Sequence, residues 1–81
     1  MNISYTDRFL KSYRQAPLSI QRKFIKQVRF LELDLRYPSL HAKKYDEALD
    51  IWQARVDRNW RFYFQIKSEQ IYLIDIMTHP K

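Results

Sequence analysis

The fold is decided by residues 51–66, which read IWQARVDRNWRFYFQI. Apolar and polar side chains alternate along this stretch, and a period of two is typical of a β-strand with one buried face. The residues expected to face the core are Trp52, Ala54, Val56, Phe62, Phe64 and Ile66. The residues expected on the opposite face are Gln53, Arg55, Arg61, Tyr63 and Gln65. The stretch therefore predicts two half-buried strands whose second face is free for function.

A short polar link, Asp57-Arg58-Asn59, separates these two strands and predicts a hairpin. Because the sequence contains no glycine, we expect Asn59 to be the hairpin residue with positive φ. A third run of alternation follows near the C-terminus. Its predicted core residues are Tyr72, Ile74 and Ile76, and the residues opposite them are Asp75, Met77 and His79. We therefore expect three antiparallel strands in sequence.

The first 36 residues predict one short strand and two helices. Ile3 and Tyr5 alternate with polar neighbours as a strand, and Thr6 offers a hydroxyl that can cap the helix after it. Pro17 ends that helix and suits the first turn of the next one. From Leu18 to Arg36, apolar residues recur at spacings of three and four, which predicts an amphipathic helix. These apolar residues are Phe24, Ile25, Val28, Leu31 and Leu35.

The chain is basic, with 15 Lys and Arg against nine Asp and Glu, a net charge of +6 and a pI near 9.8. This balance favours a polyanionic partner, either nucleic acid or an acidic protein. Residues 1–38 hold eight of the bases and three of the acids. The outer face of the second helix carries Arg22, Lys23, Lys26 and Arg29. A solvated helix surface is the simplest interpretation of that face, and contact with a partner stays open.

The remaining segment joins these two halves. Tyr37-Pro38-Ser39 ends the second helix, and the polar stretch from His41 to Asp50 predicts a loop. We therefore expect a single α+β domain over residues 1–81. Its predicted order is β-α-α-β-β-β, with two N-terminal helices packed on an antiparallel sheet.

Several classes of site are excluded by composition. The chain has no cysteine, which rules out disulfides and thiolate metal sites, and no glycine, which rules out a P-loop or dinucleotide fingerprint. The carboxylates of Asp46, Glu47 and Asp50 lie among lysines and are expected to solubilise a loop, so we expect neither a metal site nor a cofactor. The longest apolar run has four residues, Ile71 to Ile74. We therefore expect a soluble, cytoplasmic protein that does not contact a membrane.

Several short motifs follow one another in an order that is informative about the protein's family. They are Phe-Leu-Lys-Ser-Tyr at 9–13, Pro-Ser-Leu at 38–40, Lys-Lys-Tyr at 43–45, Ile-Trp-Gln-Ala-Arg-Val at 51–56, Trp-Arg-Phe-Tyr-Phe at 60–64 and Thr-His at 78–79. In order and spacing they resemble the RelE/ParE toxin superfamily over nearly the whole chain. Within it, the histidine near the C-terminus is similar to the mRNA-cleaving toxins of the YoeB and YafQ kind.

This resemblance implies the toxin of a type II toxin-antitoxin system. It implies an endoribonuclease that cleaves mRNA on the ribosome without metal and leaves 2',3'-cyclic phosphate ends. The implied partners are a cognate antitoxin, with which the toxin forms a hetero-oligomer, and mRNA and ribosomal RNA.

Site residues can be carried over position by position. The resemblance implies that Arg55 floors the RNA groove, that Arg61 holds the scissile phosphate, and that His79 is the general acid for the leaving oxygen. By alternation, these three side chains should point to the same side of the sheet. Further RNA contacts are expected from Lys43, Lys44, Gln53, Arg58 and Trp60.

Other interpretations of the same residues stay open. Arg55 could be an exposed sheet charge offsetting Asp57, Arg61 a structural ion-pair partner, and His79 a surface residue. His41 is expected to be a loop cap or an exposed contact. For the whole chain, one alternative is a ParE-like toxin that inhibits DNA gyrase by binding alone. Another is a member that only binds its antitoxin, because Met77 stands where members commonly have glycine and no aromatic residue follows His79.

Overall fold

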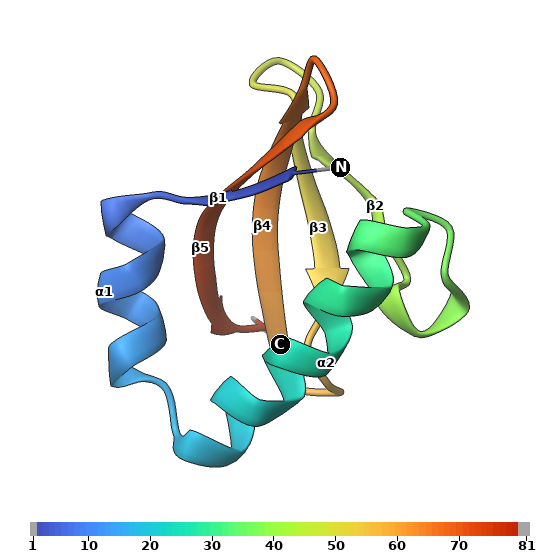
Figure 1. Cartoon of the computed structure of the whole chain (residues 1–81). Coiled ribbons are helices and arrows are strands. Elements are labelled where there is room, and N and C mark those ends of the chain that lie inside the picture. The colour runs from blue at the N-terminus through green and yellow to red at the C-terminus, as the bar shows by residue number, and fades with distance from the viewer. Residues whose placement is uncertain (1, 80–81) are drawn as a thin grey trace.

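A five-stranded sheet forms the centre of the computed structural model, which describes residues 2–79. Its strand order is β1-β5-β4-β3-β2, and two α-helices cover one face (Figure 1). The elements are β1 Asn2–Tyr5, α1 Asp7–Gln15, α2 Leu18–Leu33, the 3-10 helix η1 Pro38–Leu40, β2 Lys43–Asp46, β3 Ile51–Arg55, β4 Trp60–Lys67 and β5 Gln70–Thr78. The predicted α+β class and the early strand and helices are confirmed.

The sheet is mixed, whereas an antiparallel one was predicted. Strands β2 to β5 are antiparallel, but β1 pairs in parallel with β5, with Ile3 opposite Ile71. The two helices lie between β1 and the other strands in the sequence, and such a crossover is what a parallel pair requires.

The prediction of a loop from His41 to Asp50 is wrong for its central part. Strand β2 pairs there with β3, with Lys43 opposite Gln53 and Lys44 opposite Trp52. This strand lies at the edge of the sheet and carries mainly charged side chains, as edge strands commonly do. Its four residues show no apolar alternation, so the backbone pairing with β3 defines it and no sequence pattern does.

The core faces of β4 and β3 follow the predicted alternation, but that of β5 does not. Ile71 and Leu73 are fully buried, whereas Tyr72 is 37% exposed, so the prediction that Tyr72 and Ile74 face the core is wrong. The cause is a β-bulge: Tyr63 pairs with Asp75 while Phe64 pairs with Leu73, which leaves Ile74 as an extra residue. The bulge restores the predicted phase at Ile76, which is buried.

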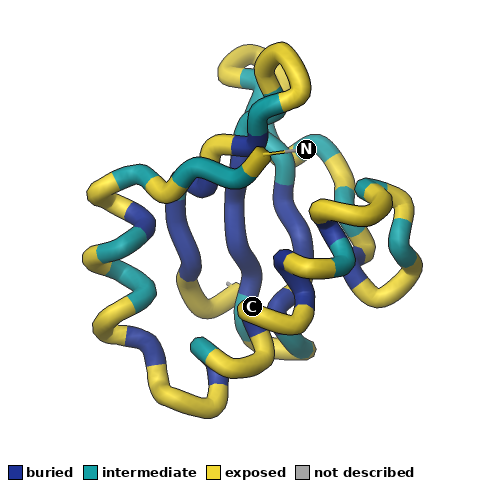
Figure 2. Tube along the Cα trace, viewed as in Figure 1, coloured by how far each residue is buried: buried dark blue, intermediate teal, exposed yellow. Residues whose placement is uncertain are grey.

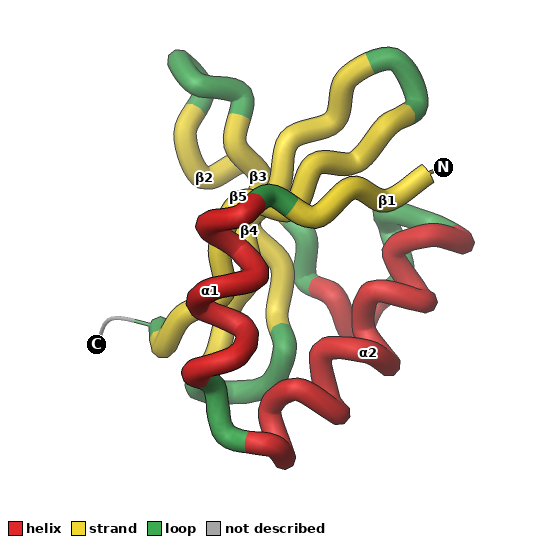
Figure 3. Tube along the Cα trace, turned by 60° about the vertical axis from the view of Figure 1, so that its left-hand side comes forward, coloured by secondary structure: helices red, strands yellow, loops and turns green. Residues whose placement is uncertain are grey.

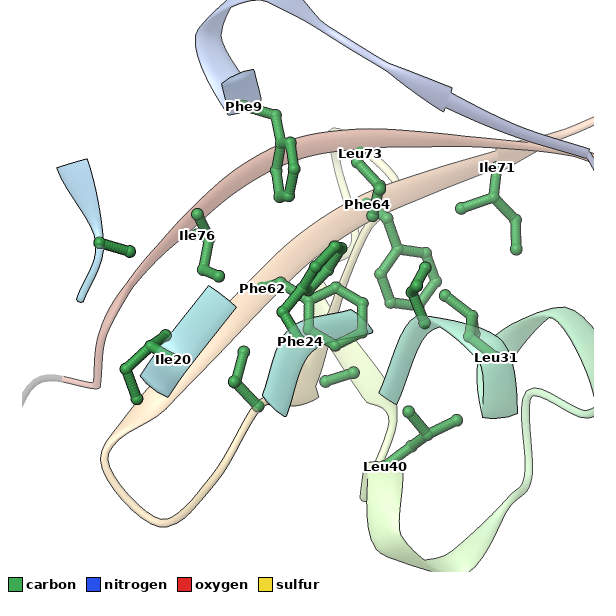
Figure 4. Packing of buried hydrophobic residues seen from close by; sticks show 14 residues of the cluster. Phe9, Ile20, Phe24, Leu31, Leu40, Phe62, Phe64, Ile71, Leu73 and Ile76 are labelled. Atoms are coloured by element: carbon green, nitrogen blue, oxygen red, sulfur yellow. The ribbon is translucent and has the colours of Figure 1, made fainter. Parts of the chain in front are cut away.

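Aromatic side chains tie the helices to the sheet. Phe24 of α2 packs 5.1 Å from Phe9 of α1 and 5.2 Å, edge to face, from Phe62 of β4 (Figure 4). The buried residues of the sheet lie in its three central strands, β5, β4 and β3, and the outer turns are largely exposed (Figure 2). Because the core lies on the helix side, the side chains that point away from it form a second face, which we call the open face.

The helix boundaries follow from local hydrogen bonds. Thr6 Oγ1 accepts from the backbone N–H of Phe9 at 3.1 Å, which confirms the predicted cap of α1. A short link at residues 16–17 connects α1 to α2 (Figure 3). Helix α2 ends at Leu33, three residues before the predicted Arg36, because Asp34 becomes extended and its carboxylate accepts from the backbone N–H of Arg36.

The hairpin between β3 and β4 forms as predicted, but a side-chain hydrogen bond stabilises its turn instead of a residue with positive φ. Positive φ is found at His41, Asp50, Ser68 and Glu69 among residues 2–79, and not at Asn59 as predicted. Instead, Asp57 Oδ1 accepts from the backbone N–H groups of Asn59 and Trp60, each at 2.9 Å. A side chain that satisfies the turn's own donors removes the need for a left-handed residue there.

Candidate active site

A hollow of about 370 Å³ brings together residues from four separate segments. It is lined by His41, Ala42, Lys43, Gln53, Arg55, Arg61 and His79. We call it the cationic hollow, since Lys43, Arg55 and Arg61 carry positive charge and no acidic residue lines it. The three predicted catalytic residues therefore line one cavity, together with two of the five predicted RNA contacts.

The two arginines face each other across neighbouring strands. Arg55 on β3 pairs directly with Arg61 on β4, and their side chains lie on the open face because Ala54 and Phe62 point to the core. Arg55 is exposed, whereas Arg61 is only 8% exposed. Burial lowers the pKa of the Arg61 guanidinium, and the neighbouring Arg55 charge lowers it further. Like charges placed opposite each other are unfavourable, so this pair favours an anion between them.

The buried guanidinium of Arg61 is held by the hairpin. Its Nη1 donates to the carbonyl oxygens of Asp57 at 2.7 Å, Trp60 at 3.0 Å and Arg58 at 3.2 Å. Within residues 2–79, neither Arg61 nor Arg55 has a carboxylate within ion-pair distance. Arg61 is thus oriented by neutral carbonyl groups, and no ion pair within residues 2–79 neutralises its charge.

His79 directly follows β5 and is anchored to the same hairpin. Its backbone N–H donates to the carbonyl of Asn59 at 2.7 Å, and its side chain is exposed at the wall of the cationic hollow. The end of β5 lies beside the turn between β3 and β4 (Figure 1). The His79 side chain therefore lines the same cavity as the two arginines, as the alternation predicted.

The predicted RNA contacts divide into two groups. Lys43 and Gln53, which pair across β2 and β3, line the cationic hollow. Gln53 is buried and its Nε2 donates to the hydroxyl of Tyr63 at 3.4 Å. Arg58 lies outside this hollow and lines a neighbouring groove.

Lys44 and Trp60 lie away from the cationic hollow. Lys44 forms ion pairs with Asp50 and Glu47 and stands 5.2 Å from the ring centre of Trp52, on the core side of β2. The hydrogen bond to Asp50 raises the pKa of Lys44. Trp60 packs against the hydrophobic core, because it shares the face of Phe62 two residues later.

His41 lines the cationic hollow, although it was expected to be only a loop cap or an exposed contact. It does cap η1, with φ of 46° and a backbone N–H that donates to the Pro38 carbonyl at 3.3 Å. The left-handed backbone turns the chain into β2 and leaves the side chain exposed, where it lines the cationic hollow and two neighbouring cavities. No local pattern marks this position, since the pairing of β2 with β3 brings it to Arg55.

A second cavity of about 570 Å³ runs between α2 and the β3–β4 hairpin. Lys23, Lys26 and Arg58 line this basic groove, and Arg55 and His41 line both it and the cationic hollow. Its acidic residue, Asp57, forms an ion pair with Lys23 at 3.1 Å. Burial acts to raise the pKa of Asp57, but hydrogen bonds from Asn59, Lys23 and Trp60 outweigh it and hold the pKa below its ordinary value.

Residues 2–79 contain no group of three or more His, Cys, Asp or Glu side chains placed to hold a metal ion. Neither helix within this range is long and apolar enough to cross a membrane.

Comparison by sequence finds no relative: no protein-family model matches, and no curated protein matches. Comparison by structure finds similar proteins. The chain is similar to a YoeB/ParE toxin from Agrobacterium tumefaciens, with a TM-score of 0.81, 13% identity and coverage of 99% of this chain and 100% of the toxin. It is also similar to the archaeal RelE-RelB complex from Pyrococcus horikoshii, with a TM-score of 0.77, 15% identity and coverage of 95% and 92%.

A YafQ variant from E. coli is a third structural neighbour, with a TM-score of 0.73, 14% identity and coverage of 96% and 92%. All three likenesses extend over nearly the whole length of both chains. The protein therefore has the fold of the RelE/ParE toxins, as the motifs suggested.

Proposed function

We propose that this protein is the toxin of a type II toxin-antitoxin system and acts as an endoribonuclease on mRNA. The observation that carries the proposal is the cationic hollow, where two arginines without carboxylate partners and a histidine line one cavity. The fold shared with YoeB/ParE, RelE and YafQ toxins supports the proposal. A fold by itself hosts many functions, so the side chains of the hollow carry the argument.

The chemistry required is transfer of the phosphodiester to the adjacent 2'-oxygen. The 2'-oxygen attacks phosphorus, the bond from phosphorus to the 5'-oxygen breaks, and a proton passes from the 2'-hydroxyl to a base. A second proton is delivered to the departing 5'-oxygen. The products are a 2',3'-cyclic phosphate and a 5'-hydroxyl, and no metal ion takes part.

Each of these tasks has a side chain in the hollow. Arg55 and Arg61 stabilise the charge of the pentavalent phosphorane, because guanidinium offers paired donors and stays protonated at working pH. His79 donates the proton to the leaving oxygen, since imidazole exchanges protons near neutral pH. Lys43 and His41 line the same hollow and are the candidates for the base.

Two further parts of the proposal concern partners. A cognate antitoxin binds the toxin, as RelB does in the Pyrococcus horikoshii complex, and an acidic segment of it would match the basic groove. Cleavage takes place on translating ribosomes in the cytoplasm, where the basic outer face of α2 meets ribosomal RNA phosphates.

The proposal is tested by mapping RNA 5' ends after brief induction of the protein in cells. We expect growth arrest and new 5' ends within coding sequences, and both should disappear in Arg55→Ala. If Arg55→Ala arrests growth as strongly as the wild type while DNA supercoiling falls, the protein is a gyrase inhibitor of the ParE kind. If neither protein arrests growth but the antitoxin still binds, the chain is a binding-only member.

A further inference from the structure

A smaller hollow of about 180 Å³ lies next to the cationic one. Two aromatic and three aliphatic side chains form most of its wall: Tyr45, Tyr63, Ile51, Ile74 and Met77. Arg8 and Asp75 close it, and they neutralise each other in an ion pair of 3.0 Å. We call this cavity the tyrosine hollow. It offers an apolar surface with no net charge beside a site that carries three cations.

The walls of the tyrosine hollow are fixed by contacts within the sheet. Tyr63 is 6% exposed, accepts a hydrogen bond from Gln53 and meets the ring of Tyr45 edge to face, with 4.9 Å between centroids. Asp75 is anchored by Arg8 and by the backbone N–H of Ile76 at 2.8 Å. The β5 bulge places Ile74 on this side, away from the core. Tyr45 remains 60% exposed, so a ring face is accessible to a ligand.

The two hollows are neighbours on the open face. Met77 is the cross-strand partner of Arg61, so the wall of one cavity adjoins the wall of the other. Tyr63 follows Arg61 by two residues on the same face of β4, which is about 6.6–6.8 Å along a strand. Gln53 lines the cationic hollow and donates to Tyr63. The spacing from Arg61 to Tyr63 therefore suits one nucleotide, with its phosphate at Arg61 and its base beside Tyr63, whose ring meets that of Tyr45.

We propose that the tyrosine hollow binds a nucleobase of the RNA strand whose phosphate lies between Arg55 and Arg61, with the base stacked on Tyr45. The proposal rests on the proposed function, since it concerns the same substrate. Single-stranded RNA is commonly bound by stacking unpaired bases on aromatic rings beside a cationic track. Here an uncharged aromatic cavity adjoins a cationic one, which matches the charge distribution of a nucleotide.

Other occupants fit the hollow less well. A stable contact between two copies buries on the order of 800 Å² per partner, far more than the few side chains of this cavity supply. An acidic peptide would find no free cation in it, because Arg8 is already paired with Asp75. A planar ring needs neither a large area nor a charge partner.

The experiment uses ribosomes loaded with a defined mRNA and measures single-turnover cleavage as a function of toxin concentration. The variants are Tyr45→Ala, Tyr45→Phe and, as a matched control, Tyr72→Ala. Tyr72 is also an exposed tyrosine of the sheet, but it does not line the hollow. Each protein is assayed on the natural mRNA and on versions with one abasic nucleotide on either side of the cleaved bond.

We expect Tyr45→Ala to raise the half-maximal toxin concentration about 5- to 150-fold, the range of one lost base stack. Tyr45→Phe and Tyr72→Ala should behave as the wild type. One of the abasic positions should weaken the wild type to the same extent and add nothing to Tyr45→Ala, as expected when two changes remove one contact. Unchanged thermal melting of Tyr45→Ala would show that folding is intact.

The inference is overturned if Tyr45→Ala matches Tyr72→Ala, or if the abasic and Tyr45→Ala effects are fully additive. It is also overturned if Tyr45→Ala changes only the oligomeric state in sedimentation or only the affinity for an acidic antitoxin segment. These outcomes are distinct from failure of the proposed function. If Tyr45→Ala shows no effect but the wild type cleaves in an Arg55-dependent way, only the proposed base site is refuted. If the wild type cleaves no mRNA, both the base site and the proposed function are refuted.

Discussion

Gln27 should be the polar side chain whose loss most weakens the fold around the site. It lies on α2 and is 7% exposed. Its Nε2 donates to the carbonyl oxygens of Arg55 at 2.8 Å and Ser39 at 3.0 Å, and its Oε1 accepts from Ser39 Oγ at 3.1 Å. One carboxamide thus joins α2 to η1 and to the end of β3, the two segments that carry His41 and Arg55.

The cost of removing this group can be worked from those three bonds. Gln27→Met keeps much of the side-chain volume but removes all three hydrogen bonds. Each contributes about 0.5–1.5 kcal/mol net, so we expect a loss of about 1.5–4.5 kcal/mol. A domain of this size has a total stability of about 4–12 kcal/mol, so the variant would be close to unfolding.

Urea denaturation followed by circular dichroism measures this loss directly. The matched control is Lys26→Met, one residue earlier on the exposed side of α2, for which we expect a change within about 0.5 kcal/mol. A loss below about 1 kcal/mol in Gln27→Met would refute the reasoning, because it would mean that the three hydrogen bonds are replaced by water at no cost.

Three further predictions concern the two arginines, Asp57 and the antitoxin. Arg55→Ala and Arg61→Ala should each slow cleavage about 10²- to 10³-fold at every pH between 5 and 9, since guanidinium does not titrate there; a loss that varies with pH in single-turnover assays would contradict this. Asp57→Asn should destabilise the protein at neutral pH. Because the folded-state pKa of Asp57 is lowered, the stability from this carboxylate is fully present above its unfolded-state pKa. It is lost as the pH falls through the folded-state pKa, so the difference between the two proteins should vanish there. Parallel denaturation at neutral and acid pH would show whether the gap closes. Mixing with the product of a neighbouring antitoxin gene should raise the melting temperature, and unchanged melting would count against the partner.

The convergence of Arg55, Arg61 and His79 could be predicted from strand alternation. Arg55 and Arg61 lie in two strands with clear apolar phases, and His79 shares their side because the β5 bulge precedes it and restores the phase. Trp60 packs against the core on the face of Phe62, a position that was not predicted. Its expected RNA contact rested on the ability of an aromatic ring to stack on a base, and it stays a prediction without support from the geometry.

The features that could not be predicted depend on contacts between distant segments. Residues 71–76 are apolar on both faces except at Asp75, so their pattern fits either phase and does not locate the bulge at Ile74. Strand β2 has no apolar alternation, and its pairing with β3 decides that Lys43 lines the cationic hollow while Lys44 faces Trp52. His41 reaches the hollow for the same reason.

The central claim is that the cationic hollow cleaves RNA by acid-base chemistry with His79 as the acid. The most direct test is the pH dependence of single-turnover mRNA cleavage by the wild type and by His79→Gln, in the presence of a metal chelator. We predict a loss of about 10²- to 10⁴-fold in the variant, and the limb on which the wild-type rate falls as imidazolium loses its proton should become flat. Cleavage by His79→Gln at nearly the wild-type rate, with the same pH profile, would contradict the account.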